Sequence, residues 1–369
     1  MVNFEDFDLE DFEYDDFLQE PYPDYFYEWD DALSGNQNIR FLDEDELSDI
    51  IEIYLHEGEI KKARQTIEYA LKFYPTDEDL IYDILLLLND HELWNDVLVL
   101  AEQQQGLSEA WVDGHKLAAL LHLGMEEDAF AFFQKIKPRY EKDTEQLSLI
   151  YQVMGESLHE VDLFDAAHDV VEEAISLLGP NLEFYWLQLR THLASDAKDP
   201  ALEVANRIEQ FNPLDGETWH RLGSVYLDLE EPEKAIDAFE FAESLGHKTQ
   251  SNYLGLITGY EKNGNLLKAL EKAKEYLYLY PNNYMVHILA ANLCSELNLW
   301  EDALAYVDQA LNIVPDLDSL YIYKSRFLVY LGEQKKAEYA LEEGIRLTKD
   351  KQGEIRKELE KLYNDNLKK

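Results

Sequence analysis

The sequence of 369 residues has a single cysteine, Cys294, and few basic residues for its length. One thiol cannot form an intramolecular disulfide, and it excludes a zinc site built from several cysteines. Only 32 Lys and Arg stand against 77 Asp and Glu, so the formal net charge is −45. Such a charge repels nucleic-acid phosphates and anionic membrane surfaces. The composition therefore predicts that neither a nucleic acid nor a membrane is a partner.

Long apolar runs and a targeting signal are missing as well. The densest apolar run, Ile84 to Leu88, is far shorter than the about 20 residues that a membrane-spanning helix needs. The start, MVNFEDFDLE, has neither the basic nor the apolar segment of a secretory signal. With 46% hydrophobic residues the chain has enough material for a large core, unlike a disordered acidic chain. We therefore expect a cytoplasmic, folded protein.

Motifs that carry catalysis or hold cofactors are equally scarce. The sequence contains no glycine-rich phosphate loop, nucleophile elbow, HExxH motif or EF-hand loop. Its ten histidines are scattered; His115 and His122 can share a helix face, but no third metal ligand stands near them. The residues therefore predict no catalytic residue, no metal site and no cofactor, and hence a protein that is not an enzyme.

What the sequence does have is a period of 34 residues, which is the spacing of a repeat architecture. Alanines keep this spacing over six units: Ala167, Ala201, Ala235, Ala269, Ala303 and Ala337. Upstream, Ala63, Val97 and Ala129 hold the same place, and the polar stretch 138–146 accounts for the longer interval before Ala167. In each unit apolar residues recur at steps of three and four in two stretches, which predicts two helices joined by a turn.

The unit from Gly216 onward shows the pattern most clearly. Its residues are Trp219, Leu222, Gly223, Tyr226, Ala235, Phe239 and Ala242. The pattern W-x2-L-G-x2-Y followed by Ala, Phe and Ala resembles the tetratricopeptide repeat (TPR) family. The resemblance implies an all-α fold, a right-handed α-solenoid of about nine tetratricopeptide-type helix pairs with a C-terminal capping helix. The units are expected to start near Glu44, Glu78, Ala110, Ser148, Leu182, Gly216, Gln250, Tyr284 and Asp318.

Four segments are expected along the chain. Residues 1–36 form an acidic aromatic N-terminal arm and residues 37–43 a linker. Residues 44–351 form the repeat solenoid, and residues 352–369 form the C-terminal capping helix. In this last segment Ile355, Leu359 and Leu362 follow helical spacing among charged residues, so one face can cover the last repeat.

The arm combines thirteen Asp or Glu and ten aromatic residues with no Lys or Arg. The anchors expected in it are Phe12, Phe17, Tyr25, Phe26 and Trp29. Three interpretations are open: the arm docks on its own solenoid, it is a motif for another protein, or it is a charged solubility tail. Pro21 and Pro23 predict that the stretch from Pro21 to Trp29 is extended. The density of rings predicts that Tyr25, Phe26 and Trp29 are buried against repeat residues.

The resemblance also implies a binding surface, because the first helices of such repeats line a concave face on which partner peptides lie. The matching places of this sequence are Tyr82, Leu86, Trp186, Arg190, His220, Leu254, Ile288, Asn292, Ile322 and Arg326. Extended apolar surface that faces water usually marks a binding site. The alternative is that these side chains touch the neighbouring helix pair and are only partly exposed. The lysines with which related domains clamp a C-terminal carboxylate are missing at these places.

The sequence therefore predicts a non-catalytic scaffold or adaptor that binds a protein or peptide, of unknown identity, on the concave face. The arm is expected to act as an intramolecular plug or as a second binding segment. One alternative is a self-assembling structural protein in which the arm of one chain occupies the groove of another. A further alternative is an acidic decoy for basic partners.

Overall fold

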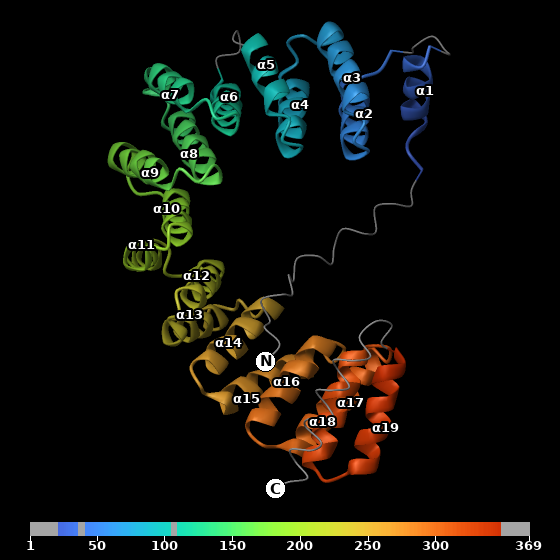
Figure 1. Ribbon diagram of the computed structural model, residues 1–369. Helices are drawn as coiled ribbons and strands as arrows, with labels where there is room; N and C mark the ends of the chain where they lie inside the picture. Colours follow the sequence, from blue (N-terminus) through green and yellow to red (C-terminus); the bar gives the residue numbers. More distant parts are fainter. Residues whose placement is uncertain (1–20, 36–40, 105–108, 348–369) are drawn as a thin grey trace. The chain divides into compact units, whose positions relative to one another are not determined.

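The computed structural model describes residues 21–35, 41–104 and 109–347, and every regular element in these ranges is an α-helix. The expected C-terminal capping helix (352–369), the anchors Phe12 and Phe17, and most of the expected linker lie outside the described residues. The chain divides into two compact units, Met1–Thr191 and His192–Lys369. Each unit is described by itself below (Figure 1).

Unit 1 contains nine described helices and most of a tenth. Their bounds are α1 Asp24–Leu33, α2 Glu44–His56, α3 Ile60–Phe73, α4 Glu78–Asp90, α5 Trp94–Gln103, α6 Ala110–His122, α7 Glu126–Tyr140, α8 Thr144–Glu160, α9 Phe164–Leu178 and α10 Leu182–Ala194. Consecutive helices pack as the pairs α2–α3, α4–α5, α6–α7 and α8–α9. The first helices of neighbouring pairs also touch, so that α2, α4, α6 and α8 form one row.

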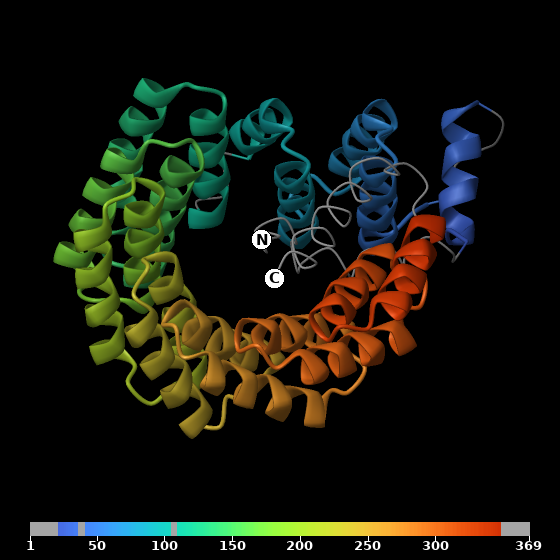
Figure 2. The ribbon, with the colours of Figure 1, turned by 60° about the horizontal axis from the view of Figure 1, so that its bottom comes forward.

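Unit 2 begins within the end of α10 and repeats the same plan. Its helices are α11 Lys198–Phe211, α12 Gly216–Asp228, α13 Pro232–Ser244, α14 Gln250–Lys262, α15 Leu266–Leu279, α16 Tyr284–Glu296, α17 Trp300–Ile313, α18 Asp318–Tyr330 and α19 Gln334–Leu347. The pairs α12–α13, α14–α15, α16–α17 and α18–α19 pack in sequence, as a second view of the ribbon also shows (Figure 2).

The alanine period has a packing cause. All nine residues at this place, from Ala63 to Ala337 and including Val97, are buried in the second helix of their pair. A small side chain there lets the second helix lie close to the first. The prolines that follow twelve residues later, such as Pro75 and Pro213, stand just past the ends of α3 and α11, since proline cannot continue a helix.

Five of the first helices begin at a capping residue that keeps the same period. Asp43 accepts a hydrogen bond from the backbone N–H of Glu46, and Asp77, Asp215, Thr249 and Asn283 cap α4, α12, α14 and α16 in the same way. These side chains satisfy backbone donors that a helix start leaves unpaired. The expected unit starts therefore coincide with observed helix starts, except that α8 begins at Thr144, four residues before Ser148.

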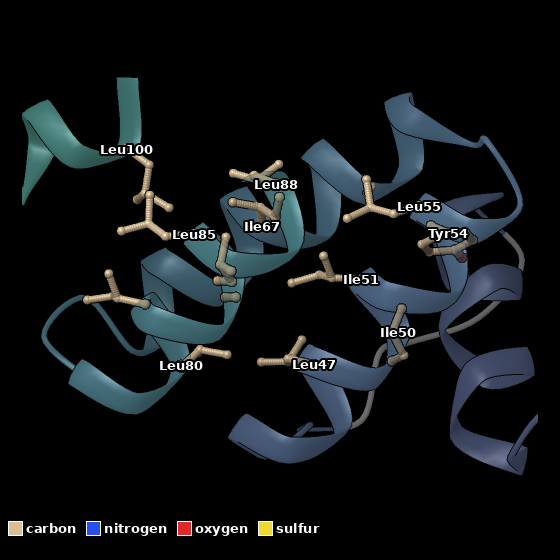
Figure 3. Close-up of a cluster of buried hydrophobic side chains, with 14 of the residues drawn as sticks. Leu47, Ile50, Ile51, Tyr54, Leu55, Ile67, Leu80, Leu85, Leu88 and Leu100 are labelled. Atoms are coloured by element: carbon tan, nitrogen blue, oxygen red, sulfur yellow. The ribbon is translucent and has the colours of Figure 1, made fainter. Parts of the chain in front are cut away.

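The core of unit 1 consists of two clusters of buried side chains, one over α1 to α6 and one over α6 to α10. In unit 1, leucine, isoleucine and tyrosine side chains of α2 to α5 interlock, among them Leu47, Ile51, Tyr54, Leu85 and Leu100 (Figure 3). The core of unit 2 includes a close approach at Phe239 of α13. A Cβ added at Gly223 of α12 or at Gly255 of α14 would lie 2.6 or 2.4 Å from its ring. The absence of these side chains thus lets one ring join three helices.

Cys294 lies fully buried in α16. Burial raises the pKa of its thiol to about 11, so the reactive thiolate is scarce at neutral pH.

The stretch from Pro21 to Trp29 corrects a prediction. It was expected to be extended, but Asp24–Leu33 is the helix α1. Pro23 stands at the N-cap with φ −62° and ψ 153°, outside the helix, where it begins the helix rather than breaking it. The apolar residues Tyr22, Phe26, Trp29 and Leu33 recur at helical steps and all face the core of unit 1.

Candidate interaction surface

Among the expected binding residues, the exposed apolar side chains lie on α4. Tyr82 and Leu86 keep 43% and 40% of their surface exposed. Across the contact with α6, the Tyr82 ring centroid is 5.4 Å from that of Trp111 and 6.3 Å from that of His115, both edge to face. We name Tyr82, Leu86, Trp111 and His115 the aromatic patch. It joins two adjacent first helices of unit 1.

The sequence of α4 determines which side chains face outward. Ile81, Ile84, Leu85 and Leu88 are buried in the core of unit 1. Since these residues occupy one stripe of the helix, the residues between them at Tyr82, Asp83 and Leu86 point away from it. The N-cap at Asp77 fixes where α4 begins and hence which of its side chains face the core.

Exposed carboxylates lie beside the aromatic patch, on α4 and on the adjacent α2. Asp79 and Asp83 are exposed on α4, and Asp45 is exposed on the adjacent α2. We name these three the acidic rim. Ser48 Oγ on α2 lies 3.5 Å from Asp83 Oδ2 on α4, so the two helix faces meet here. Burial, and then repulsion from Asp79, Asp45 and Asp77, raises the pKa of Asp83 above its usual range, while the Ser48 hydrogen bond acts against this.

His115 is the imidazole of the aromatic patch. Its burial lowers the pKa below the usual range, and Asp90 acts against this shift. At neutral pH the imidazole is therefore uncharged and belongs to the apolar part of the surface.

The remaining candidates of unit 1 lie on α10 and differ from each other. Arg190 is exposed, with its guanidinium 3.9 Å from Glu156 on α8. Trp186 is only 5% exposed, so its ring belongs to the interior instead of the expected exposed row. The same place in the repeat is thus open in α4 and closed in α10.

The candidates of unit 2 are half-buried. They are His220 on α12, Leu254 on α14, Ile288 and Asn292 on α16, and Ile322 and Arg326 on α18. His220 lies 3.2 Å from Asn252 and contacts the rings of Phe239 and His247. Its pKa is lowered mainly by burial. His220 thus contacts both its own pair and the next one, and part of every one of these side chains stays open.

The anchors Tyr25, Phe26 and Trp29 belong to α1 and contact α2 and α3, the first helix pair. Trp29 is 2% exposed and donates a hydrogen bond from Nε1 to Thr66 Oγ1 of α3 at 2.8 Å. Phe26 packs on Tyr54 of α2, and the half-buried Tyr25 donates a hydrogen bond to Asp49 of the same helix. The residues that these anchors contact are therefore distinct from the aromatic patch.

Trp111 was absent from the residues that the sequence pointed to. The two matching places of α6 hold Gly114 and Ala118, both small and buried, so the row of large side chains seemed to skip this helix. Trp111 lies one turn earlier. An aromatic residue next to the expected helix start at Ala110 was the signal available in the sequence.

The described residues contain no candidate metal site. Nowhere in the described ranges do three His, Cys, Asp or Glu side chains gather as a metal site requires. His122 stacks on Trp94 at 3.9 Å and lies 3.0 Å from Glu160, away from His115's contact with Tyr82. None of the described helices is long and apolar enough to cross a membrane.

Comparison with known proteins supports the fold. No protein-family model and no curated protein matches the sequence. Among solved structures, the C-terminal part of a TPR repeat-containing protein from Cytophaga hutchinsonii is similar at 14% identity, with a TM-score of 0.50 over 63% of this chain and 93% of that one. A tetratricopeptide repeat protein from Parabacteroides merdae shares 14% identity over 74% of this chain and 98% of its own, with a TM-score of 0.42. YrrB, a TPR protein described as having an unusual peptide-binding site, shares 16% identity over 62% of this chain and 97% of its own, with a TM-score of 0.36.

The helix pairs, the buried alanine at each repeat and this likeness agree with one another. The chain has the fold of a tetratricopeptide repeat protein.

Proposed function

We propose that the chain is a non-catalytic scaffold or adaptor that binds a protein or peptide on the first-helix face of unit 1. The observation that carries the proposal is the aromatic patch, in which Tyr82 and Leu86 remain exposed beside Trp111. Large apolar side chains that stay open to water on adjacent helices are typical of protein-binding surfaces.

The organisation proposed with this function keeps residues 1–36 as the arm, 44–351 as the repeats and 352–369 as a C-terminal cap. Within the arm, α1 acts as the N-terminal cap, because Phe26 and Trp29 cover side chains of α2 and α3 that the first pair would otherwise expose. Residues before α1 supply the second binding segment. The proposal does not include binding of α1 to the aromatic patch, because the α1 anchors contact other residues.

Affinity capture with the full chain tests the proposal. We expect the wild-type chain to retain a set of proteins that a Tyr82→Ser/Leu86→Ser/Trp111→Ser variant loses, because the variant removes the apolar contacts. The matched control is Leu267→Ser/Tyr278→Ser, which removes two more exposed apolar side chains on α15, a second helix of unit 2.

Three results would contradict the proposal. If the patch variant retained the same proteins as the wild type, the aromatic patch would not be the binding surface. The same would follow if the α15 control lost as many proteins as the patch variant. Light scattering that shows growth of the particle mass with concentration, abolished by deletion of the arm, would favour self-assembly instead.

A further inference from the structure

The first helices α2 and α4 of unit 1 differ in charge from the first helices of unit 2. In unit 1, α2 and α4 together carry nine Asp or Glu and no Lys or Arg. In unit 2, the first helices α12, α14, α16 and α18 carry five acidic residues and four basic ones. The excess of negative charge on α2 and α4 therefore lies on one side of the aromatic patch and includes α4, which presents Tyr82 and Leu86.

The carboxylates of the acidic rim have no basic partner among the residues that the structure describes. Asp45, Asp79 and Asp83 form no ion pair with a Lys or Arg among the described residues. Elsewhere in unit 1 carboxylates do have such partners, for example Asp96 with Arg64 at 2.7 Å and Glu173 with Lys137 at 2.7 Å. Repulsion within the rim contributes to the raised pKa of Asp83. A cation placed at the rim would relieve this repulsion.

We infer that the aromatic patch and the acidic rim together bind a peptide segment that carries Lys or Arg next to large apolar residues. The inference rests on the proposed function and adds the chemistry of the partner. The basic residues pair with Asp45, Asp79 and Asp83, while the apolar residues cover Tyr82, Leu86 and Trp111.

The spacing of the helices sets the length of the segment. Packed helices lie about 8–10 Å apart, so the path from α2 over α4 to α6 is about 20 Å. An extended peptide rises about 3.3 Å per residue, so about six residues cover this path. The basic residues belong at the α2 end of the segment, where the surface is acidic, and the apolar residues at the α6 end, where it is aromatic.

Fluorescence anisotropy with the full chain and synthetic peptides tests the inference. The probe is a labelled peptide with three lysines followed by two leucines and a tryptophan. Its partner probe has three glutamates in place of the lysines. We expect the lysine peptide to bind at least about tenfold more tightly than the glutamate peptide, and its affinity to fall as salt is added.

Charge variants assign the effect to the rim. Asp79→Asn/Asp83→Asn should weaken binding of the lysine peptide by roughly threefold to tenfold, as expected for two partly exposed charge pairs. Asp79→Lys/Asp83→Lys should reverse the preference in favour of the glutamate peptide. The matched control, Asp165→Asn/Asp169→Asn, removes two exposed carboxylates from the second helix α9 and should leave the affinity unchanged.

Each opposite outcome overturns the inference. Equal binding of the two peptides would leave the proposed function standing but refute a basic partner. An equal effect of the α9 control would assign the attraction to net charge alone. A concentration-dependent dimer that Asp79→Asn/Asp83→Asn dissociates would give the surface to a second copy of the chain. If neither peptide binds, and the patch variant also captures the same proteins as the wild type, both this inference and the proposed function are wrong.

Discussion

Trp29 attaches α1 to the first helix pair through a buried ring and a hydrogen bond to Thr66. Trp29→Ala removes both and leaves a cavity, so we expect the free energy of unfolding of the first pair to fall by about 3–5 kcal/mol. Denaturant titration, together with hydrogen exchange of the α1 amides, measures the loss. The control is Tyr27→Ala, at an exposed neighbour, which should change this free energy by less than about 0.5 kcal/mol. Similar losses in the two variants would refute the role of Trp29.

Asp30 makes the attachment of α1 depend on pH. Its carboxylate accepts hydrogen bonds from Lys62 Nζ at 2.7 Å and from the Tyr54 hydroxyl at 2.8 Å. The bond from Lys62 is the main cause that holds the pKa of Asp30 below its ordinary value of 3.8. The folded state therefore favours the carboxylate, so the stabilisation is complete above the unfolded-state pKa and is lost as the pH falls through the folded-state pKa.

The comparison of the wild type with Asp30→Asn measures this dependence. We expect Asp30→Asn to be less stable than the wild type at pH 7, and the difference in free energy of unfolding to shrink below about pH 4. A difference that stays constant from neutral to strongly acidic pH would show that the charge of Asp30 contributes nothing.

At the scale of the elements, the turn inside each helix pair contains one residue in the left-handed region of backbone space. These residues are Gly58, Glu92, Gly124, Asp162, Asp196, Glu230, Gly264, Asn298 and Gly332. Four are glycines, which adopt this conformation without strain, and five carry side chains. Glutamate has no special tolerance for it, so Glu92 and Glu230 bear strain of about 1–2 kcal/mol each.

Glu230→Gly should therefore stabilise unit 2. We expect the free energy of unfolding to rise by about 0.5–1 kcal/mol, because the strain removed exceeds the entropy that a glycine adds to the unfolded chain. Gly264→Ala, the converse change at the same place of the next pair, should lower it by about 1 kcal/mol. Urea denaturation compares the three chains. If both changes move the stability in one direction, backbone strain is not the cause.

The period of the sequence was sufficient to place most helices but not α1. Alanine recurs because the second helix of a pair packs closely on the first, and proline recurs because it stands just past the end of the second helix. The starts of α2, α4 and α12 could therefore be predicted to the residue. The position of Pro23 relative to a helix start has no such period, and the same residue can either break a helix or precede one.

The candidate surface could be predicted only in part for a related reason. Tyr82 and Trp186 hold the same place in their repeats, but one is exposed and the other is buried. Burial depends on the side chains that neighbouring helices contribute, and these vary from pair to pair. Trp111 was missed because it lies one turn from the place that the resemblance indicated.

At the scale of the whole molecule, the net charge of −45 acts against the folded state through repulsion among its carboxylates. Raising the ionic strength from about 0.01 M to about 0.15 M shortens the screening length from about 30 Å to about 8 Å. We therefore expect the Tm to rise over this range, equally for NaCl and KCl. Calorimetry measures the change. A fall in Tm would mean that the ion pairs contribute more to stability than the repulsion removes.

The buried Cys294 makes the protein convenient for site-specific labelling. Because the only native thiol is fully buried in α16 and hardly ionised, a maleimide dye has no accessible target on the folded wild-type protein. A single cysteine introduced at an exposed position would then be the one group to react, without removal of the native residue. A fluorophore attached beside Leu86 in this way would report directly on whether the aromatic patch is occupied.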